Sequence, residues 1–166
     1  YSDAMRRYGS DKPDLRYGLE IADTSGIFRD SGFKVFSGAV NSGGHVTALT
    51  VQGESISRSM IDRLEETLKK QDAKGLPWIR WSDPAKPESA IVKFLKPEEL
   101  EALRAQLNIK PGQLTFFGVG TDYAPFSHMG LLRTEFISDK KLNELAGFPK
   151  PAKKWAFLWV RHFPLL

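Results

Sequence analysis

The sequence contains no cysteine among its 166 residues, and this absence excludes several kinds of site. Without thiols the chain forms no disulfide, binds no metal through thiolate and has no cysteine nucleophile. A protein free of cysteine fits the reducing cytoplasm, where we expect this one to function. Its three histidines, His45, His128 and His162, are far apart and have no carboxylate at ligand spacing, so we expect no zinc site.

Long apolar runs are also absent. No stretch approaches the roughly 20 apolar residues of a membrane-spanning helix, and the first residues do not show a secretory signal pattern. The chain begins at Tyr1 rather than at a methionine and stops at Leu166 directly after an apolar run, so we expect an internal portion of a longer protein. The segment Gly118-Val119-Gly120-Thr121 lacks the Lys-Ser/Thr ending of a phosphate-binding loop and the spacing of a dinucleotide fingerprint.

The remaining composition is that of a folded protein. Apolar residues make up 41% and charged residues 27% of the chain, which argues against disorder. A chain of 166 residues is long enough to bury a substantial core and suits one domain with short appended segments.

The net charge of +4 lies entirely at the C-terminal end. Residues 150–166 carry Lys150, Lys153, Lys154 and Arg161 and no acid, while the preceding 149 residues hold 20 basic and 20 acidic side chains. A basic segment of this kind meets a phosphate backbone well. A short lysine-rich linker that only keeps the protein soluble explains the same pattern, and both alternatives stay open.

The most distinctive stretch is a run of nine residues near the start, Tyr8, Gly9, Ser10, Asp11, Lys12, Pro13, Asp14, Leu15 and Arg16. Glycine, serine, aspartate and proline each favour turns, so this run predicts one. Upstream, Asp3 is positioned to cap a short helix that runs to Arg7. The alternating charges of this region either bind a phosphate or pair with one another.

Periodicity predicts an α+β fold, a mostly antiparallel sheet with helices packed on it. The clearest helix covers 57–73, where Ile61, Leu64 and Leu68 share one face and Gly75 follows the end. The pattern predicts further helices over 97–107, 124–135 and 138–146, and strands over 33–37, 45–51, 76–81, 90–95 and 114–119. We expect the first two strands to form a hairpin. In the helix from Pro97, the acids Glu98, Glu99 and Glu101 are interpreted as exposed side chains that complement the helix dipole.

The nine-residue run resembles the segment by which bacterial-type aspartyl-tRNA synthetases leave their class II catalytic domain and enter a large insertion. At the other end, Trp155-Ala156-Phe157-Leu158-Trp159-Val160, followed by Phe163-Pro164-Leu165-Leu166, is similar to the strand by which that family re-enters the catalytic domain. Between them, the segments 31–36, 73–76, 92–95 and 114–118 resemble landmarks of the insertion, which is called the GAD domain and is shared with a subunit of the archaeal glutamyl-tRNA amidotransferase.

The resemblance implies three parts: an exit segment over 1–17, a GAD insertion domain over 18–150 and a return segment over 151–166. It implies a parent enzyme that activates aspartate with ATP and Mg²⁺, transfers it to tRNA, functions in the cytoplasm as a homodimer and does not act at a membrane. The signature segments of the class II catalytic site are missing, so no catalytic residue is expected here and the fragment itself should be inactive. The alternatives are a GAD module of an amidotransferase-type protein that only binds, and an α+β domain of another role.

The same resemblance implies that the insertion lies near the acceptor arm of tRNA, as a module without catalysis. The candidate tRNA contacts are the lysines at the C-terminal end, Lys140, Lys141, Lys150, Lys153 and Lys154. Four tryptophans, Trp78, Trp81, Trp155 and Trp159, invite a base-stacking interpretation, but we expect most of them to pack in the core or at an interface.

The sequence departs from the family pattern at a few positions. The family usually has an aspartate immediately before Phe-Pro in the return segment, where this chain has His162. Arg161 is also unusual there, and residues 118–128 match the family poorly.

Overall fold

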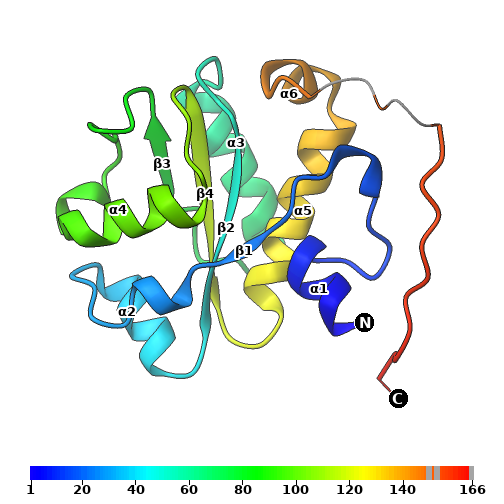
Figure 1. Ribbon diagram of the computed structural model, residues 1–166, viewed down its shortest axis with the longest axis horizontal. Helices are drawn as coiled ribbons and strands as arrows, with labels where there is room; N and C mark the ends of the chain where they lie inside the picture. Colours follow the sequence, from blue (N-terminus) through cyan, green and yellow to red (C-terminus); the bar gives the residue numbers. More distant parts are fainter. Residues whose placement is uncertain (149–150, 152–153, 165–166) are drawn as a thin grey trace.

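A four-stranded antiparallel sheet forms the centre of the computed structural model, which describes residues 1–148, 151 and 154–164 (Figure 1). The strands are β1 (Ala22–Asp23), β2 (His45–Gln52), β3 (Trp78–Trp81) and β4 (Gln113–Gly120), in the order β1-β2-β4-β3. The two long strands pair along their whole length, from His45 opposite Gly120 to Gln52 opposite Gln113. The α+β fold with an antiparallel sheet is therefore confirmed.

Helices cover both faces of the sheet (Figure 1). One face packs against α3 (Arg58–Lys69), α5 (Ala124–Ser138) and α6 (Lys140–Leu145), with α1 (Ser2–Tyr8) lying on α5. The other face packs against α2 (Lys34–Asn41), α4 (Pro97–Gln106) and the 3₁₀ turns Ser25–Ile27 and Val92–Phe94. A third 3₁₀ turn, Leu15–Tyr17, follows α1.

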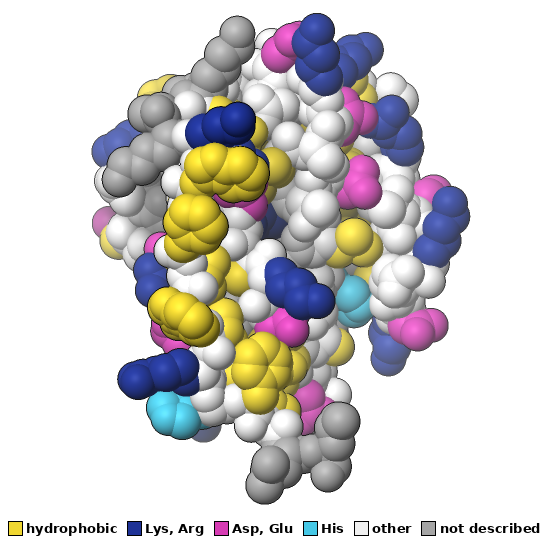
Figure 2. Space-filling view, turned by 90° about the vertical axis from the view of Figure 1, so that its right-hand side faces the viewer, with side chains coloured by type: hydrophobic (Ala, Val, Ile, Leu, Met, Phe, Trp, Pro, Cys, Tyr) yellow, Lys and Arg dark blue, Asp and Glu magenta, His cyan; other side chains and the backbone are white. Residues whose placement is uncertain are grey.

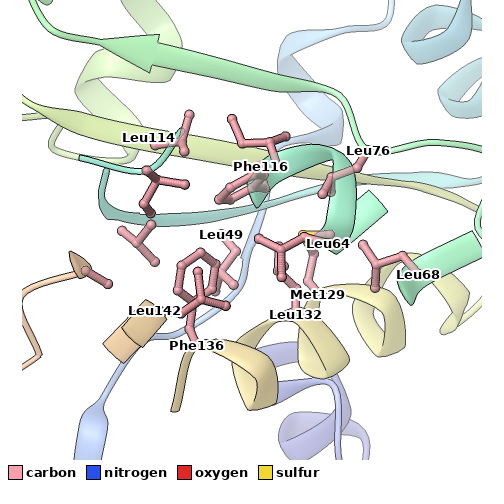
Figure 3. Close-up of a cluster of buried hydrophobic side chains, with 14 of the residues drawn as sticks. Leu49, Leu64, Leu68, Leu76, Leu114, Phe116, Met129, Leu132, Phe136 and Leu142 are labelled. Carbon is pink, nitrogen blue, oxygen red and sulfur yellow. The ribbon is translucent and has the colours of Figure 1, made fainter. Parts of the chain in front are cut away.

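Alternation along the strands separates the two cores. Leu49 of β2 and Phe116 of β4 point toward α3 and α5, where Figure 3 shows them among Leu64, Leu132 and Phe136. Val46, Ala48 and Phe117 point to the opposite core, which also holds Phe28, Phe36 and Trp81. Because side chains of a strand alternate between faces, one pair of central strands supplies both cores.

The predicted strand over 33–37 is wrong, because these residues begin helix α2. Phe36 and Ser37 are buried while Val35 is 53% exposed, so the buried positions follow helical rather than alternating spacing. The predicted hairpin is wrong for the same reason. Strand β2 pairs instead with β1 and β4.

The segment 90–95 is also not a strand, since it forms the 3₁₀ turn Val92–Phe94. Glu99, interpreted as an exposed acid, is 5% exposed. Its carboxylate accepts hydrogen bonds from the backbone N–H of Lys96 at 2.7 Å and from the Ser31 hydroxyl at 3.3 Å. Glu99 therefore caps α4 and ties it to the turn before α2.

The other predicted helices are confirmed, with altered ends. Helix α3 is capped by the Ser57 hydroxyl, which accepts from the N–H of Met60, and it buries Ile61, Leu64 and Leu68 as expected. It ends at Lys69, and the chain takes its left-handed turn at Asp72 (φ 63°) rather than at Gly75. Helix α1 is confirmed without the predicted cap, because Asp3 lies in its first turn.

Two glycines bring α1 into backbone contact with α5. Gly9 ends α1 in the left-handed conformation (φ 65°), and a Cβ atom there would lie 2.1 Å from the carbonyl oxygen of Phe126. A Cβ on Gly130 would lie 2.6 Å from the carbonyl oxygen of Gly9. Only glycine fits at either position, so this contact fixes where the N-terminal segment lies.

This geometry predicts opposite effects for two glycine-to-alanine changes. Gly130→Ala should lower the free energy of unfolding by about 1–3 kcal/mol, because the new methyl group overlaps the backbone of Gly9. Gly38→Ala is the matched control, since Gly38 lies within α2 with nothing within 4 Å of the added Cβ. It should raise the free energy by about 0.4–1 kcal/mol. Urea unfolding of both variants measures this, and equal effects would contradict the packing described.

Candidate functional site at the two chain ends

The two ends of the chain lie side by side (Figure 1). The amino group of Tyr1 donates to the carbonyl oxygen of Arg161 at 2.6 Å, and the rings of Tyr1 and Phe163 are 5.3 Å apart. Further along, the Arg16 guanidinium donates to the carbonyl oxygen of Lys154 at 3.2 Å. A segment that leaves and re-enters another domain at neighbouring points requires this proximity.

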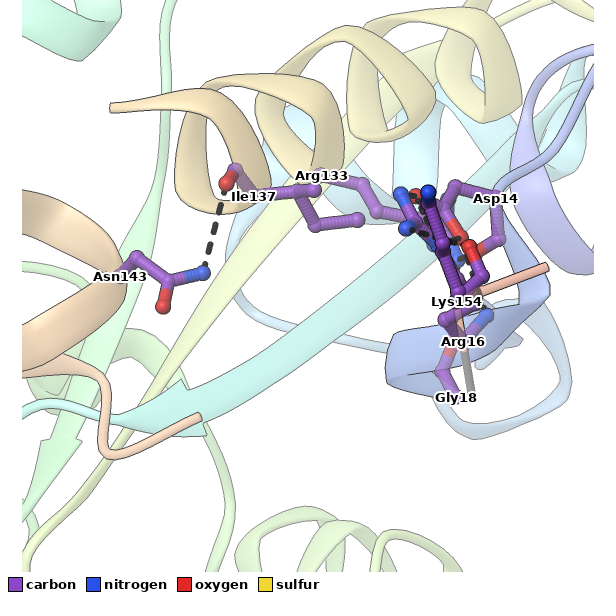
Figure 4. Close-up of polar contacts among 7 residues, drawn as sticks. All are labelled: Asp14, Arg16, Gly18, Arg133, Ile137, Asn143 and Lys154. Carbon is purple, nitrogen blue, oxygen red and sulfur yellow. Dashed lines mark hydrogen bonds and ion pairs between the residues drawn. The ribbon is translucent and has the colours of Figure 1, made fainter. Parts of the chain in front are cut away.

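The end of the nine-residue run is a compact turn built on Asp14 and Arg16 (Figure 4). The carboxylate of Asp14 accepts the backbone N–H of Arg16 at 3.0 Å and caps the 3₁₀ turn Leu15–Tyr17. The Arg16 side chain also donates to it, Nε to Oδ1 at 2.8 Å and Nη2 to Oδ2 at 2.5 Å. This ion pair lowers the pKa of Asp14.

Arg133 of α5 holds the same turn from beneath. Its side chain is 3% exposed, and it donates to the carbonyl oxygens of Asp14, of Gly18 at 3.1 Å and of Leu19 at 3.0 Å. Its guanidinium lies 5.2 Å from the ring centre of Tyr8. Burial lowers the pKa of Arg133, but a guanidinium keeps its charge in proteins. The buried charge donates its hydrogen bonds to backbone carbonyls, and the nearby carboxylates of Asp14 and Glu20 also favour the charged form.

A second cluster joins α1 to Glu20, in the segment that leads into β1. Arg7 donates to both carboxylate oxygens of Glu20, at 3.1 and 2.5 Å, and the Tyr8 hydroxyl donates to the same carboxylate at 3.1 Å. Arg7 also lies 3.6 Å from Asp3. The hydrogen bonds from Arg7 lower the pKa of Glu20 and raise that of Arg7, while burial and Glu20 raise the pKa of Tyr8.

These pairings favour the self-paired interpretation of the charged run over phosphate binding. Of the four basic side chains of this region, Arg7 and Arg16 already have carboxylate partners. Arg6 lies 5.8 Å from the ring centre of Phe126, and Lys12 forms no ion pair with the described residues. The cluster therefore has a positioning role, because it holds the N-terminal segment against α5.

An exposed apolar strip runs down the C-terminal end, visible as a column of hydrophobic side chains in Figure 2. We use this name for Trp155 (65% exposed), Phe157 (90%), Trp159 (94%) and Phe163 (53%). The expected strand is not formed, because the described residues between 154 and 164 belong to no sheet. Trp81, in contrast, is fully buried, and Trp78 is half-buried.

Of the lysines expected to contact tRNA, the structure describes Lys140, Lys141 and Lys154. Lys140 and Lys141 are exposed at the start of α6, where Lys140 lies 4.0 Å from Glu144. Lys154 is exposed and its ammonium lies 5.6 Å from the ring centre of Trp155. Lys150 and Lys153 lie outside the described residues.

The histidines are separate, as the sequence indicated. His45 is half-buried, with Nδ1 2.9 Å from the Asp23 carboxylate. His128 has Nε2 2.8 Å from the carbonyl oxygen of Gln71, and His162 is exposed with φ 58°. Within residues 1–148, 151 and 154–164, no three histidine or acidic side chains stand close enough to hold a metal ion. No helix of this part is long and apolar enough to cross a bilayer.

Sequence reasoning missed Arg133 and Glu20 as members of this site. Glu20 follows the nine-residue run and Arg133 lies far from it in the sequence. Their roles depend on the packing of α5 against the turn. The available signal was an arginine in the middle of the apolar helix 124–135, where a charge needs a partner.

Comparison with known proteins covers the whole chain. The model of the GAD domain family matches residues 36–124. The aspartate–tRNA(Asp/Asn) ligase of Elusimicrobium minutum is 44% identical over 168 residues, which span 100% of this chain and 27% of that protein. The aspartate–tRNA ligase of Oceanobacillus iheyensis is 40% identical over 168 residues, with the same two coverages. The chain thus spans about a quarter of the length of these relatives, and the similarity includes both ends, beyond the match to the family model.

Replacing Arg133 should destabilise the turn between Asp14 and Leu19. Arg133→Met keeps much of the side-chain volume but leaves the carbonyls of Asp14, Gly18 and Leu19 without their donor, at a cost of about 2–4 kcal/mol in unfolding free energy. Arg29→Met is the matched control, because Arg29 is exposed, and it should change stability by less than about 0.5 kcal/mol. Urea unfolding compares the two variants, and a similar small effect of both would contradict the role of Arg133.

Acid should weaken the contact between α1 and Glu20. Because the folded pKa of Glu20 is lowered, its stabilising effect is complete above the unfolded pKa of about 4.3 and is lost as the pH falls through the folded value. Unfolding free energies measured from pH 6 to pH 3 should therefore fall less steeply for Glu20→Gln than for the unsubstituted chain. Glu101→Gln, at an exposed position of α4, should retain the parent slope, and identical slopes for all three would contradict the assignment.

Proposed function

This chain belongs to the GAD domain family, and we propose that it is the insertion domain of an aspartate–tRNA ligase with short flanks from the catalytic domain. The observation that carries the proposal is the meeting of the two ends, where Tyr1 contacts Arg161 and Arg16 contacts Lys154. An insertion leaves and re-enters its host at neighbouring points. The similarity to aspartate–tRNA ligases over 100% of the chain supports the same host.

We place the exit segment at 1–17, the insertion domain at 18–150 and the return segment at 151–166. The exposed apolar strip supports this division, since Phe157 and Trp159 are about as exposed as side chains become. Four large apolar side chains in a row form a patch of the kind that soluble proteins usually cover. In the proposed host, the rest of the ligase covers the strip.

The host would activate aspartate with ATP and Mg²⁺, transfer it to tRNA and function as a homodimer in the cytoplasm. The residues described here do not fit the metal, because no cluster of three histidine or acidic side chains exists in that part of the chain. ATP and Mg²⁺ are therefore assigned to the portion of the host outside this chain. An amidotransferase-type binding module is the less favoured alternative, because the ligases match both flanks as well as the domain.

The chain by itself should not form aspartyl-adenylate. The reason is that the signature segments of the class II catalytic site are missing from its sequence. Aspartate-dependent exchange of pyrophosphate into ATP, measured on the purified chain, should stay at the background level of a sample without protein. Exchange above that level would overturn the proposal that the chain is a non-catalytic part.

Weak, salt-dependent binding of tRNA is expected from the lysines near the C-terminal end. Changing Lys140, Lys141, Lys150, Lys153 and Lys154 to alanine should weaken binding of cognate and non-cognate tRNA alike, because phosphate contacts carry no sequence information. It should also flatten the dependence of log K on log salt, since each phosphate contact contributes about 0.7–0.9 to the slope.

The matched control changes five lysines elsewhere in the chain that are exposed, Lys70, Lys86, Lys93, Lys96 and Lys110, and so alters the net charge equally. Filter binding at several salt concentrations compares both variants with the parent chain. A slope that responds equally to both sets would return the C-terminal lysines to a role in solubility.

A further inference from the structure

A cavity of about 390 Å³ opens beside β4, away from the residues of the chain-end site. Its floor is apolar and buried, formed by Leu68, Phe117 and Met129. The half-buried rings of Phe33 and Trp78 also line it. Its volume lies within the range of about 300–1,000 Å³ typical of small-molecule sites.

A second cavity of about 580 Å³ adjoins the first, because Val35, Lys74, Val119 and His128 line both. At the rim of the second cavity, Lys34 and Asp72 join Lys74. Together they form one groove with an apolar, aromatic end and a basic end.

The charged side chains around the groove leave a net positive charge at its basic end. Arg58 pairs with Asp62 at 2.9 Å, and Glu65 pairs with Lys69 at 2.9 Å, so these two lining side chains are neutralised within α3. Lys34 and Lys74 are exposed and form no ion pair with the described residues. Asp72 is the acid that offsets them in part. An anionic group is therefore favoured at the basic end.

The first cavity also contains a free stretch of strand edge. The N–H of Phe117 donates to the carbonyl oxygen of Pro77 at 2.8 Å, on the side of β4 that carries β3. The residues of a strand point their N–H and C=O groups to alternate sides. The N–H and C=O of Val119, two residues after Phe117, therefore point to that same side. Strand β3 begins at Trp78, opposite Phe116, so the cavity rather than a strand lies beside Val119.

From these features we propose that the groove binds a nucleotide, with the base in the apolar end and the phosphate over Lys74 and Lys34. Aromatic walls accept the faces of a base, and one peptide N–H and C=O match the donors and acceptors at its edge. The free edge amounts to one residue, which is too short for the row of hydrogen bonds that an added peptide strand needs. The proposal does not depend on the ligase assignment, because it uses only the groove.

Binding is measured by equilibrium dialysis of the 166-residue chain against AMP, ribose 5-phosphate and single-stranded hexa-adenylate. AMP should bind saturably and ribose 5-phosphate much more weakly, because it lacks the base. Hexa-adenylate binding at least about tenfold tighter than AMP would identify an RNA strand as the source of the nucleotide, and equal affinities a free nucleotide; both support the site.

Two variants test the location. Ala90→Trp places an indole in the first cavity from an exposed position, and it should weaken AMP binding roughly tenfold or more by steric exclusion. Its control is Ala85→Trp, at an exposed position of the same loop that does not line the groove. Lys74→Ala should weaken AMP binding about threefold, in the range of an exposed ion pair, and Lys70→Ala should leave it unchanged.

Three results would overturn the proposal. They are the absence of saturable binding of both AMP and hexa-adenylate, equal binding of AMP and ribose 5-phosphate, and an AMP affinity that Ala90→Trp leaves unchanged. Saturable binding of an acidic extended peptide in place of any nucleotide would also overturn it, in favour of strand addition at Val119.

Discussion

The buried guanidinium of Arg133 is the interaction on which the arrangement of the chain ends depends. It donates hydrogen bonds to the carbonyl oxygens of Asp14, Gly18 and Leu19 and so fixes the path of the chain between α1 and β1. A buried charge is costly unless its hydrogen bonds are satisfied, and here three carbonyls satisfy it. The backbone contact of Gly9 with Gly130, one turn earlier on α5, adds a steric constraint on the same segment.

With the entry segment fixed, the C-terminal end has a surface to lie against. Arg16 reaches the carbonyl of Lys154, and Tyr1 reaches Arg161. These contacts hold the backbone at Lys154 and Arg161, while the side chains of Phe157 and Trp159 remain exposed. The sheet and its two cores thus serve as a rigid platform, and in the proposed host the surface that meets the rest of the ligase is concentrated at the two chain ends. The groove beside β4 uses none of these residues, so the two surfaces are independent in composition.

The parts of the fold that sequence reasoning predicted are those with one strong period. Helix α3 has Ile61, Leu64 and Leu68 on one face and a serine cap, and β2 and β4 are rich in β-branched and aromatic residues. The errors at 33–37 and 90–95 concern short segments. Over so few residues, the positions of Phe33, Phe36 and Phe94 fit the spacing of a strand and that of a helix equally well. Tertiary packing against Phe28 and Phe117 decided the first of these in favour of a helix. The nine-residue run was predictable as a turn, whereas Arg133 and Glu20 were not, because their partners are set by the docking of α5.

The proximity of the chain ends is the central claim, and a distance between two spin labels tests it most directly. The absence of natural cysteine allows labels at Ser2→Cys and Arg161→Cys without background. Electron–electron double resonance should give a narrow distribution at short distance in the parent background, broadened toward long distances by Arg133→Met. A broad, long distribution in the parent background would contradict the account, because the ends would then not meet.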